Sequence, residues 1–257
     1  LVGSEMCIRD RWYSLFKAIF GPPLLVWNRP RIYGVENIPD EGPALLVSNH
    51  QAVLDSFYLP LMVRRQLKFP AKMEYFTGTG LSGRLQRFFF TAVGQVPIDR
   101  SSDTAGDVLL ETVKKIFDDG ELFGIYAEGT RSPDGRVYKG RTGMARIAMP
   151  TGVPVILAGM IGSGRANPIG TKLIRPVKVQ IKISEPIDPR AWAVENGYDP
   201  DSREVMRPFT DYCMHRIAEM IGEEYVDVYA TDVKKSLEQT GKYPEGAEPK
   251  TGPKGVQ

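Results

Sequence analysis

His50 and Asp55 are the two residues of this chain best suited to proton transfer. They follow a short apolar run, Ala44 to Val47, in the stretch Pro-Ala-Leu-Leu-Val-Ser-Asn-His-Gln-Ala-Val-Leu-Asp. A carboxylate that accepts a hydrogen bond from one imidazole nitrogen leaves the other nitrogen free to remove a proton from a hydroxyl group. His50 is therefore a candidate general base, and Asp55 is its candidate orienting partner.

The spacing of this pair places a condition on the local fold. Residues five apart on a regular α-helix are rotated by about 140° from each other, so the two side chains could not meet if the whole segment were helical. A loop at His50 that becomes a helix near Asp55 removes the conflict, and Asp55-Ser56 suits a helix N-terminus. We therefore expect His50 at the carboxyl end of a buried strand, where open α/β sheets bind ligands.

A structural role is the alternative for both residues. His50 would then be a hydrogen-bonded loop histidine and Asp55 only a helix cap, because short motifs often match by chance. The chain has two histidines, and His215 falls in a periodic helix where packing or surface exposure is the default. The choice depends on what the later segments add.

A second constellation, Glu128-Gly129-Thr130-Arg131, directly follows an apolar run. Gly129 lets backbone amides approach an anion, Thr130 adds a hydroxyl donor, and Arg131 offers a planar fork suited to a phosphate monoester. Glu128 can hold that arginine or bind a substrate hydroxyl. A polar turn is the alternative at residues 132–135, but it does not explain the four residues before it.

Two further basic residues, Lys72 and Arg100, stand at strand ends. Lys72 follows the strand-like residues 67–71, and Arg100 ends the strand-like residues 94–100. Either residue alone is more often a solvated surface charge than a ligand group. Because they recur at strand ends, we keep both as candidates for substrate binding.

Strands and helices alternate through the middle of the chain. Residues 104–119 have the apolar face of an amphipathic helix, and buried strands are expected at 122–127 and 153–158. Residues 177–184 alternate like a half-exposed strand. This order predicts an α/β domain with a mostly parallel central sheet flanked by helices.

Composition narrows the class of protein. The chain has 257 residues, of which 42% are hydrophobic and 25% charged, so it is globular and long enough for one large domain. A net charge of +2 gives no argument for nucleic-acid binding. Cys7 and Cys213 form neither a disulfide framework nor a metal-ligand cluster, so we expect no metal site and a reducing compartment.

Both ends of the chain differ from its centre. We interpret residues 1–11 as a non-native leader, because they show no periodicity and do not resemble the rest of the chain. Residues 12–30 hold an aromatic, apolar helical segment, too short and interrupted to span a membrane and suited to the membrane interface; a core helix is the alternative. The main domain is expected at 31–230, and a polar, disordered tail at 231–257.

Four blocks, taken in order, resemble the glycerolipid acyltransferase family. The closest likeness is to the bacterial 1-acyl-sn-glycerol-3-phosphate acyltransferases, also called lysophosphatidic acid acyltransferases, and it covers about residues 12–190. Two positions depart from the family pattern, because Ala127 stands where proline is usual and Gly140-Arg141-Thr142 replaces an apolar-small pair. The four blocks are Asn49-His50 to Asp55, residues 94–100, Glu128 to Ser132, and Val153 to Ile156.

The resemblance implies a glycerol-3-phosphate acyltransferase-like single domain and a direct transfer reaction. The sn-2 hydroxyl of 1-acyl-sn-glycerol 3-phosphate would attack an acyl thioester of coenzyme A or acyl carrier protein, giving phosphatidic acid in phospholipid biosynthesis. His50 would act as base with Asp55 as its partner, and no further cofactor is implied. Arg131 and Arg100, with Lys72, would hold the acceptor phosphate. The sequence has no convincing Gly-x-Ser-x-Gly nucleophile elbow, so we do not expect an acyl-enzyme.

Because both substrates carry acyl chains, we expect the reaction to take place at a membrane surface. We expect a peripheral or monotopic protein on the cytoplasmic face of the cell membrane, with Arg64, Arg65 and Lys68 contacting anionic headgroups. The expected partners are a lysophospholipid, acyl-CoA or acyl carrier protein, and the membrane, without nucleic acid. Two alternatives stay open. The first is an acyltransferase of the same family with a different acceptor, which could be glycerol 3-phosphate, a different lysophospholipid or a glycolipid. The second is a non-catalytic lipid-binding protein, which would have no need of the candidate base His50 and its partner Asp55.

Overall fold

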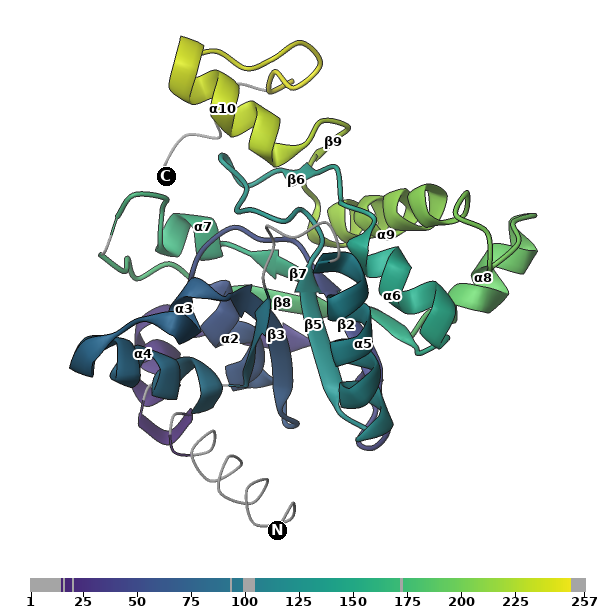
Figure 1. The fold of residues 1–257 in the computed structure, drawn as a ribbon. Coiled ribbons are helices and arrows are strands. Elements are labelled where there is room, and N and C mark those ends of the chain that lie inside the picture. The colour runs from purple at the N-terminus through teal and green to yellow at the C-terminus, as the bar shows by residue number, and fades with distance from the viewer. Residues whose placement is uncertain are drawn as a thin grey trace.

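A seven-stranded sheet forms the centre of the molecule, shown in the computed structural model of Figure 1. The structure describes residues 15, 17–19, 21–92, 94–98, 105–171 and 173–250. The strands are β1 (Arg31–Tyr33), β2 (Ala44–Ser48), β3 (Leu67–Lys72), β4 (Gln95–Ile98), β5 (Leu122–Tyr126), β7 (Val155–Ile161) and β8 (Gln180–Ile183), in the spatial order β1-β8-β7-β2-β5-β3-β4.

Most neighbouring strands of this sheet run parallel. β2 pairs in parallel with β5 and β7, and β3 pairs in parallel with β5 and β4. β8 is antiparallel to β7, while β1 is parallel to β8. The expected α/β fold with a mostly parallel central sheet is confirmed, and the carboxyl ends of β2, β3 and β5 share one edge.

Helices cover both faces of the sheet. Leu45 and Val47 of β2 belong to the core under α5, α6 and α9, whereas Ala44 and Leu46 belong to the core on the side of α2. Both faces of β2 are therefore buried, which is why its sequence is a continuous apolar run. The helices are α2 (Asp55–Met62), α3 (Glu74–Thr77), α4 (Gly80–Ala92), α5 (Ala105–Asp118), α6 (Gly143–Thr151), α7 (Ser163–Ala166), α8 (Pro189–Glu195) and α9 (Met206–Ile221), with a 3₁₀ turn η1 (Val35–Asn37).

Two strands begin later than the sequence predicts. β7 begins at Val155 and not at Val153, since Pro154 has no amide proton to donate. β8 covers only residues 180–183 of the predicted 177–184, and the amide of Val179 before it donates to the carbonyl of Asn28. Neither shift moves the strand ends that carry the candidate site.

The chain after residue 230 is folded, and the prediction of a disordered tail is wrong for residues 231–250. Helix α10 (Ala230–Thr240) lies at the top of Figure 1, beyond a two-stranded sheet of β6 (Val137–Tyr138) and β9 (Tyr225–Val226). The composition is polar, but a few apolar residues at helical spacing suffice for one buried face. They join a small core that contains Tyr138, Val226, Ala230, Val233 and Ala247.

The expected N-terminal helical conformation is present at residues 21–28. Asn28 ties this segment to the domain, because its carboxamide oxygen accepts a hydrogen bond from the Tyr58 hydroxyl at 2.7 Å. Leu25, Val26 and Trp27 are exposed, Val26 to 76%. Within the described ranges, no helix has the length and apolarity needed to cross a membrane. Residues 1–11 lie outside the described part.

Two of the basic residues expected to contact lipid headgroups are engaged within the protein. Arg65 donates to the carbonyl oxygens of Pro39, Gly42 and Gly120. Lys68 forms an ion pair with Glu121. These side chains stabilise the ends of neighbouring strands, so the headgroup role predicted for Arg65 and Lys68 is not supported; Arg64 is exposed.

Candidate active site

His50 and Asp55 meet in the loop between β2 and α2. Nδ1 of His50 lies 3.0 Å from Oδ2 of Asp55. The same oxygen accepts hydrogen bonds from the backbone amides of Gln51 at 2.7 Å and Ala52 at 2.8 Å. Asp55 therefore closes the loop and orients the imidazole with one carboxylate oxygen, and α2 begins at this residue as the spacing predicted.

This contact determines the tautomer of His50. A carboxylate only accepts, so the proton lies on Nδ1 and leaves Nε2 as a proton acceptor. The His50 side chain is 17% exposed, whereas that of Asp55 is fully buried. A buried carboxylate behind a partly exposed imidazole is the arrangement of a general base with its orienting partner.

Tyr126, the last residue of β5, stacks on His50 and was not singled out by the sequence analysis. The two ring centroids are 4.0 Å apart, with an angle of 14° between the planes. Tyr126 also stacks on Phe69 at 5.1 Å, and its hydroxyl lies 3.2 Å from Oγ of Ser56. Burial, with a smaller effect of Asp55, raises the pKa of Tyr126 well above its usual value, so the hydroxyl stays neutral.

The Glu128 to Arg131 loop is joined to the His50 loop by backbone hydrogen bonds. The amide of Ser132 donates to the carbonyl of His50 at 2.6 Å. Gly129 has a φ of +72°, and a Cβ atom there would lie 3.1 Å from Cδ of Arg141. A residue with a side chain would be strained at this position and would crowd Arg141. The structure thus brings both predicted constellations to one edge of the sheet.

Glu128 is a buried acid, with an exposed fraction of 1%. Among the described residues, neither carboxylate oxygen forms an ion pair or a hydrogen bond with another side chain, so the predicted hold on Arg131 is not formed. Burial raises the pKa of Glu128 well above its usual value, although the backbone amides of Tyr138 and His50 partly oppose this. The site therefore contains a carboxyl group with unused hydrogen-bonding capacity.

Thr130 has a partner that the sequence analysis missed. Nζ of Lys234, from α10, donates to Oγ1 of Thr130 at 2.9 Å. The signal was present in the sequence, because Ala230, Val233 and Leu237 have the spacing of one helix face. Recognising that helix would have shown that Lys234 is presented by a folded element.

Lys72 and Arg100 are the remaining residues predicted to bind substrate. Lys72 is the last residue of β3, so its backbone lies at the same sheet edge as the His50 loop. Its side chain is outside the described part of the structure. Arg100 lies outside the described residues. Their roles stay predictions.

The remaining histidine and the cysteine of the core have packing roles. His215 of α9 packs on the ring of Tyr225, with ring centroids 3.9 Å apart. Cys213 is fully buried, and burial raises the pKa of its thiol far above the usual value. Neither residue belongs to the two constellations at the sheet edge.

Fold and site together define an α/β protein that presents a carboxylate-oriented imidazole beside a Glu-Gly-Thr-Arg loop. The Acyltransferase family model matches residues 29–160, about half of the chain, and covers both constellations. The chain belongs to the Acyltransferase family, as the four sequence blocks predicted.

Individual relatives give the same assignment. A chloroplastic 1-acyl-sn-glycerol-3-phosphate acyltransferase of Brassica napus is 31% identical over 158 residues, 61% of this chain and 44% of the relative. The 1-acyl-sn-glycerol-3-phosphate acyltransferase of Bacillus subtilis (strain 168) is 24% identical over 191 residues, 74% of this chain and 87% of the relative. This chain therefore spans less than half of the Brassica protein and most of the Bacillus protein.

A solved structure is similar over most of its length. The crystal structure of the 1-acyl-sn-glycerophosphate (LPA) acyltransferase PlsC from Thermotoga maritima matches with a TM-score of 0.63 and 28% identity. The match covers 86% of this chain and 83% of the Thermotoga chain. The predicted glycerolipid acyltransferase fold is thus confirmed.

Proposed function

We propose that this protein transfers a fatty acyl group from a thioester to the sn-2 hydroxyl of 1-acyl-sn-glycerol 3-phosphate, forming phosphatidic acid. The observation that carries the proposal is the 3.0 Å contact between His50 and Asp55 on the sheet edge shared with Arg131. The acceptor has one hydroxyl to be activated and one phosphate to be held. A general base beside an arginine-containing loop suits both needs.

The reaction would proceed without an acyl-enzyme. Nε2 of His50 removes the proton of the sn-2 hydroxyl group while the oxygen of that hydroxyl attacks the thioester carbonyl. Buried Asp55 stabilises the imidazolium that forms and keeps it oriented. The tetrahedral intermediate then collapses, the carbon–sulfur bond breaks, and the imidazolium gives its proton to the leaving thiolate. The thiol is that of coenzyme A or of acyl carrier protein.

Binding of the acceptor would use the loop after β5. Arg131 pairs with the phosphate as a planar fork, and Arg100 and Lys72 add positive charge in this proposal. Glu128 offers the acceptor a hydrogen-bonding group, since its oxygens form no ion pair or hydrogen bond with another side chain in the described part of the chain. Catalysis is then mainly positioning by this loop plus proton transfer by His50.

The proposal includes peripheral or monotopic association with the cytoplasmic face of the cell membrane. Both substrates carry acyl chains, and Val26 and Leu173 expose apolar side chains, 76% and 74% accessible. Nε1 of Trp27 donates to the carbonyl of Ile174 at 3.0 Å, which joins these two segments. Such an apolar surface suits insertion into the headgroup region.

Co-sedimentation with anionic phospholipid vesicles tests this association. We expect the protein to sediment with the vesicles and Val26→Asp to weaken binding by roughly tenfold or more. Val194→Asp is the matched control, because Val194 is also exposed, on α8. A protein that stays in the supernatant, or equal binding of both variants, would refute membrane association through this surface.

Acceptor-dependent thiol release tests the reaction. The protein is mixed with an acyl-coenzyme A or an acyl carrier protein thioester, lysophosphatidic acid is added, and free thiol and phosphatidic acid are measured. We expect both products, and their loss in His50→Ala. Activity only with glycerol 3-phosphate or another lysophospholipid would show that this compound, and not lysophosphatidic acid, is the acceptor. Lipid binding without release from any donor would favour the lipid-binding alternative.

A further inference from the structure

Helix α10 is fixed over the Glu128 to Arg131 loop by contacts at two points. Nζ of Lys234 donates to Oγ1 of Thr130 at 2.9 Å, and Nη2 of Arg141 donates to Oγ1 of Thr231 at 3.2 Å. Both contacts join α10 to the part of the chain around Gly129. The helix therefore belongs to the surroundings of the candidate phosphate site.

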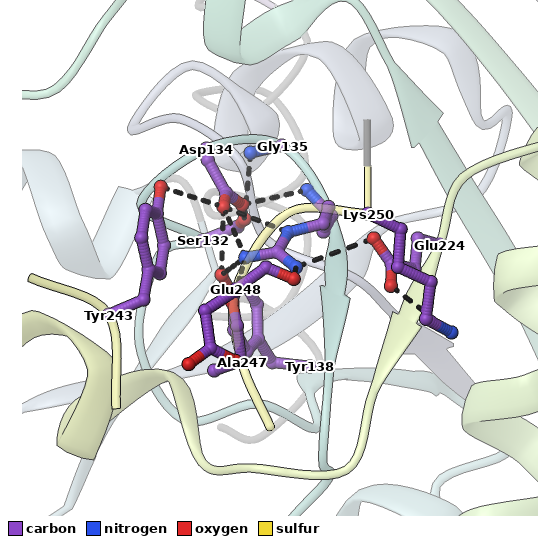
Figure 2. Close-up of polar contacts among 10 residues, drawn as sticks. Ser132, Asp134, Gly135, Tyr138, Glu224, Tyr243, Ala247, Glu248 and Lys250 are labelled. Atoms are coloured by element: carbon purple, nitrogen blue, oxygen red, sulfur yellow. Dashed lines mark hydrogen bonds and ion pairs between the residues drawn. The ribbon is translucent and has the colours of Figure 1, made fainter. Parts of the chain in front are cut away.

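The chain on both sides of α10 is anchored to the turn after this loop. Figure 2 shows the anchor, a polar network between residues 132–138 and the C-terminal segment. The Arg136 guanidinium, which is buried, donates to the carbonyl oxygens of Ala247 and Glu248. The Tyr243 hydroxyl donates to Asp134 at 3.1 Å. Before the helix, β9 pairs with β6.

This double anchor holds Lys234 near the loop before any substrate arrives. A lysine at the surface of a free helix would lose rotamer freedom on binding an anion. Lys234 is instead half-buried and already bonded to Thr130. Folding has already reduced the conformational entropy of the Lys234 side chain, so binding an anion does not reduce it again. Lys234 is in this sense a preorganised ligand group.

The charges around Lys234 fit an anion that is bound between two cations. Burial lowers the pKa of Lys234, and the nearby positive charge of Arg131 lowers it further, while Glu128 acts in the opposite direction. Two cations close together repel each other, and a phosphate dianion beside both removes that repulsion. The Thr130 hydroxyl accepts from Lys234, so its own proton is free for a phosphate oxygen.

We propose that Lys234 of α10 binds the phosphate group of the acceptor together with Arg131 and Thr130. This role rests on the proposed function and extends it to a part of the chain beyond residues 29–160, the segment matched by the family model. The C-terminal segment then contributes a substrate-binding residue to the site.

The alternative is that Lys234 only stabilises the fold through Thr130. That role would change thermal stability, and it would affect acceptors with and without phosphate equally. A phosphate ligand would change the KM for the phosphorylated acceptor selectively. Kinetics with two acceptors therefore separate the two roles.

The experiment measures acyl transfer to lysophosphatidic acid and to the phosphate-free monoacylglycerol. The variants are Lys234→Met and Lys234→Arg, with Lys235→Met as control, since Lys235 is the next residue of α10 and is exposed. We expect Lys234→Met to raise the KM for lysophosphatidic acid by roughly 10- to 100-fold, the effect of losing a charge-assisted hydrogen bond. Its KM for the acyl donor and for monoacylglycerol should stay unchanged, and Lys234→Arg should recover most of the affinity.

The outcomes distinguish this inference from the proposed function. A native protein that does not acylate lysophosphatidic acid overturns the proposed function. If the native protein is active but Lys234→Met and Lys235→Met have the same KM for lysophosphatidic acid, the proposed role of Lys234 is wrong and the proposed function stands. The same holds if Lys234→Met and Thr130→Val lower the melting temperature without a selective KM change.

Discussion

The imidazole of His50 and the phenol ring of Tyr126 lie nearly parallel, with their centroids 4.0 Å apart. Tyr126 is itself held by Phe69 on β3 and by a hydroxyl contact to Ser56. The plane of the imidazole is therefore set by an aromatic stack, while its rotation in that plane is set by Asp55. Three elements, β5, β3 and α2, contribute to the orientation of one base.

Tyr126→Leu and Tyr126→Phe separate the stack from the hydroxyl contact. Aromatic pairs contribute about 0.5–1.5 kcal/mol beyond their area, so we expect Tyr126→Leu to lower kcat by roughly 2- to 10-fold. Tyr126→Phe keeps the ring and should stay close to the native rate. The check is kcat of acyl transfer for the three proteins. Equal losses in both variants would assign the effect to the hydroxyl group instead.

His50→Ala should lower kcat by roughly 10²- to 10⁴-fold, the usual contribution of general base catalysis. Asp55→Asn should also lose activity, because the amide no longer stabilises an imidazolium or enforces the Nδ1 tautomer. The measurement is thiol release under saturating substrates. His215→Ala is the control, since that ring packs on Tyr225 and His215 belongs to neither constellation of the site. Retained activity in His50→Ala would remove His50 from the mechanism.

Glu128→Gln should stabilise the protein at neutral pH. Burial raises the pKa of Glu128, so the folded protein keeps this proton when the unfolded chain has already released it. The free energy of unfolding therefore falls as pH rises above the usual carboxyl range. Glutamine does not ionise and removes that loss, so we expect a higher free energy of unfolding at pH 7 with lower acyl transfer activity.

Thermal melts at several pH values check this prediction. The advantage of Glu128→Gln should disappear below about pH 4, where the carboxyl group is protonated in both states. Glu195→Gln serves as control, because Glu195 is exposed on α8. A variant that is no more stable than the native protein at pH 7 would contradict the account of a costly buried carboxyl group.

Arg136→Ala should release the C-terminal segment from the domain. The change leaves Asp134 and two backbone carbonyl groups without their cationic partner and Glu224 with Lys250 alone, at a cost on the order of 3 kcal/mol for a buried ion pair. We expect faster proteolysis and faster amide exchange in residues 241–250 than in the sheet. Arg216→Ala is the control, since its pair with Glu219 is exposed. Unchanged protection of the segment would contradict the anchor.

The sequence by itself determined the central strands and the His50–Asp55 pair. Continuous apolar runs predicted β2 and β5, because strands buried on both faces need such runs. The five-residue spacing excluded a continuous helix and required a loop that becomes a helix at Asp55. These are local properties, in which neighbouring residues contain the needed information.

Only the tertiary structure decided which distant residues complete the site. Tyr126 reaches His50 because β5 pairs with β2 with Tyr126 opposite Ser48, and pairing register is not contained in either strand alone. Lys234 reaches Thr130 because α10 packs on β6 and β9, although its charged composition suggested disorder. Packing brings together residues 104 positions apart, a relation that depends on the whole folded chain.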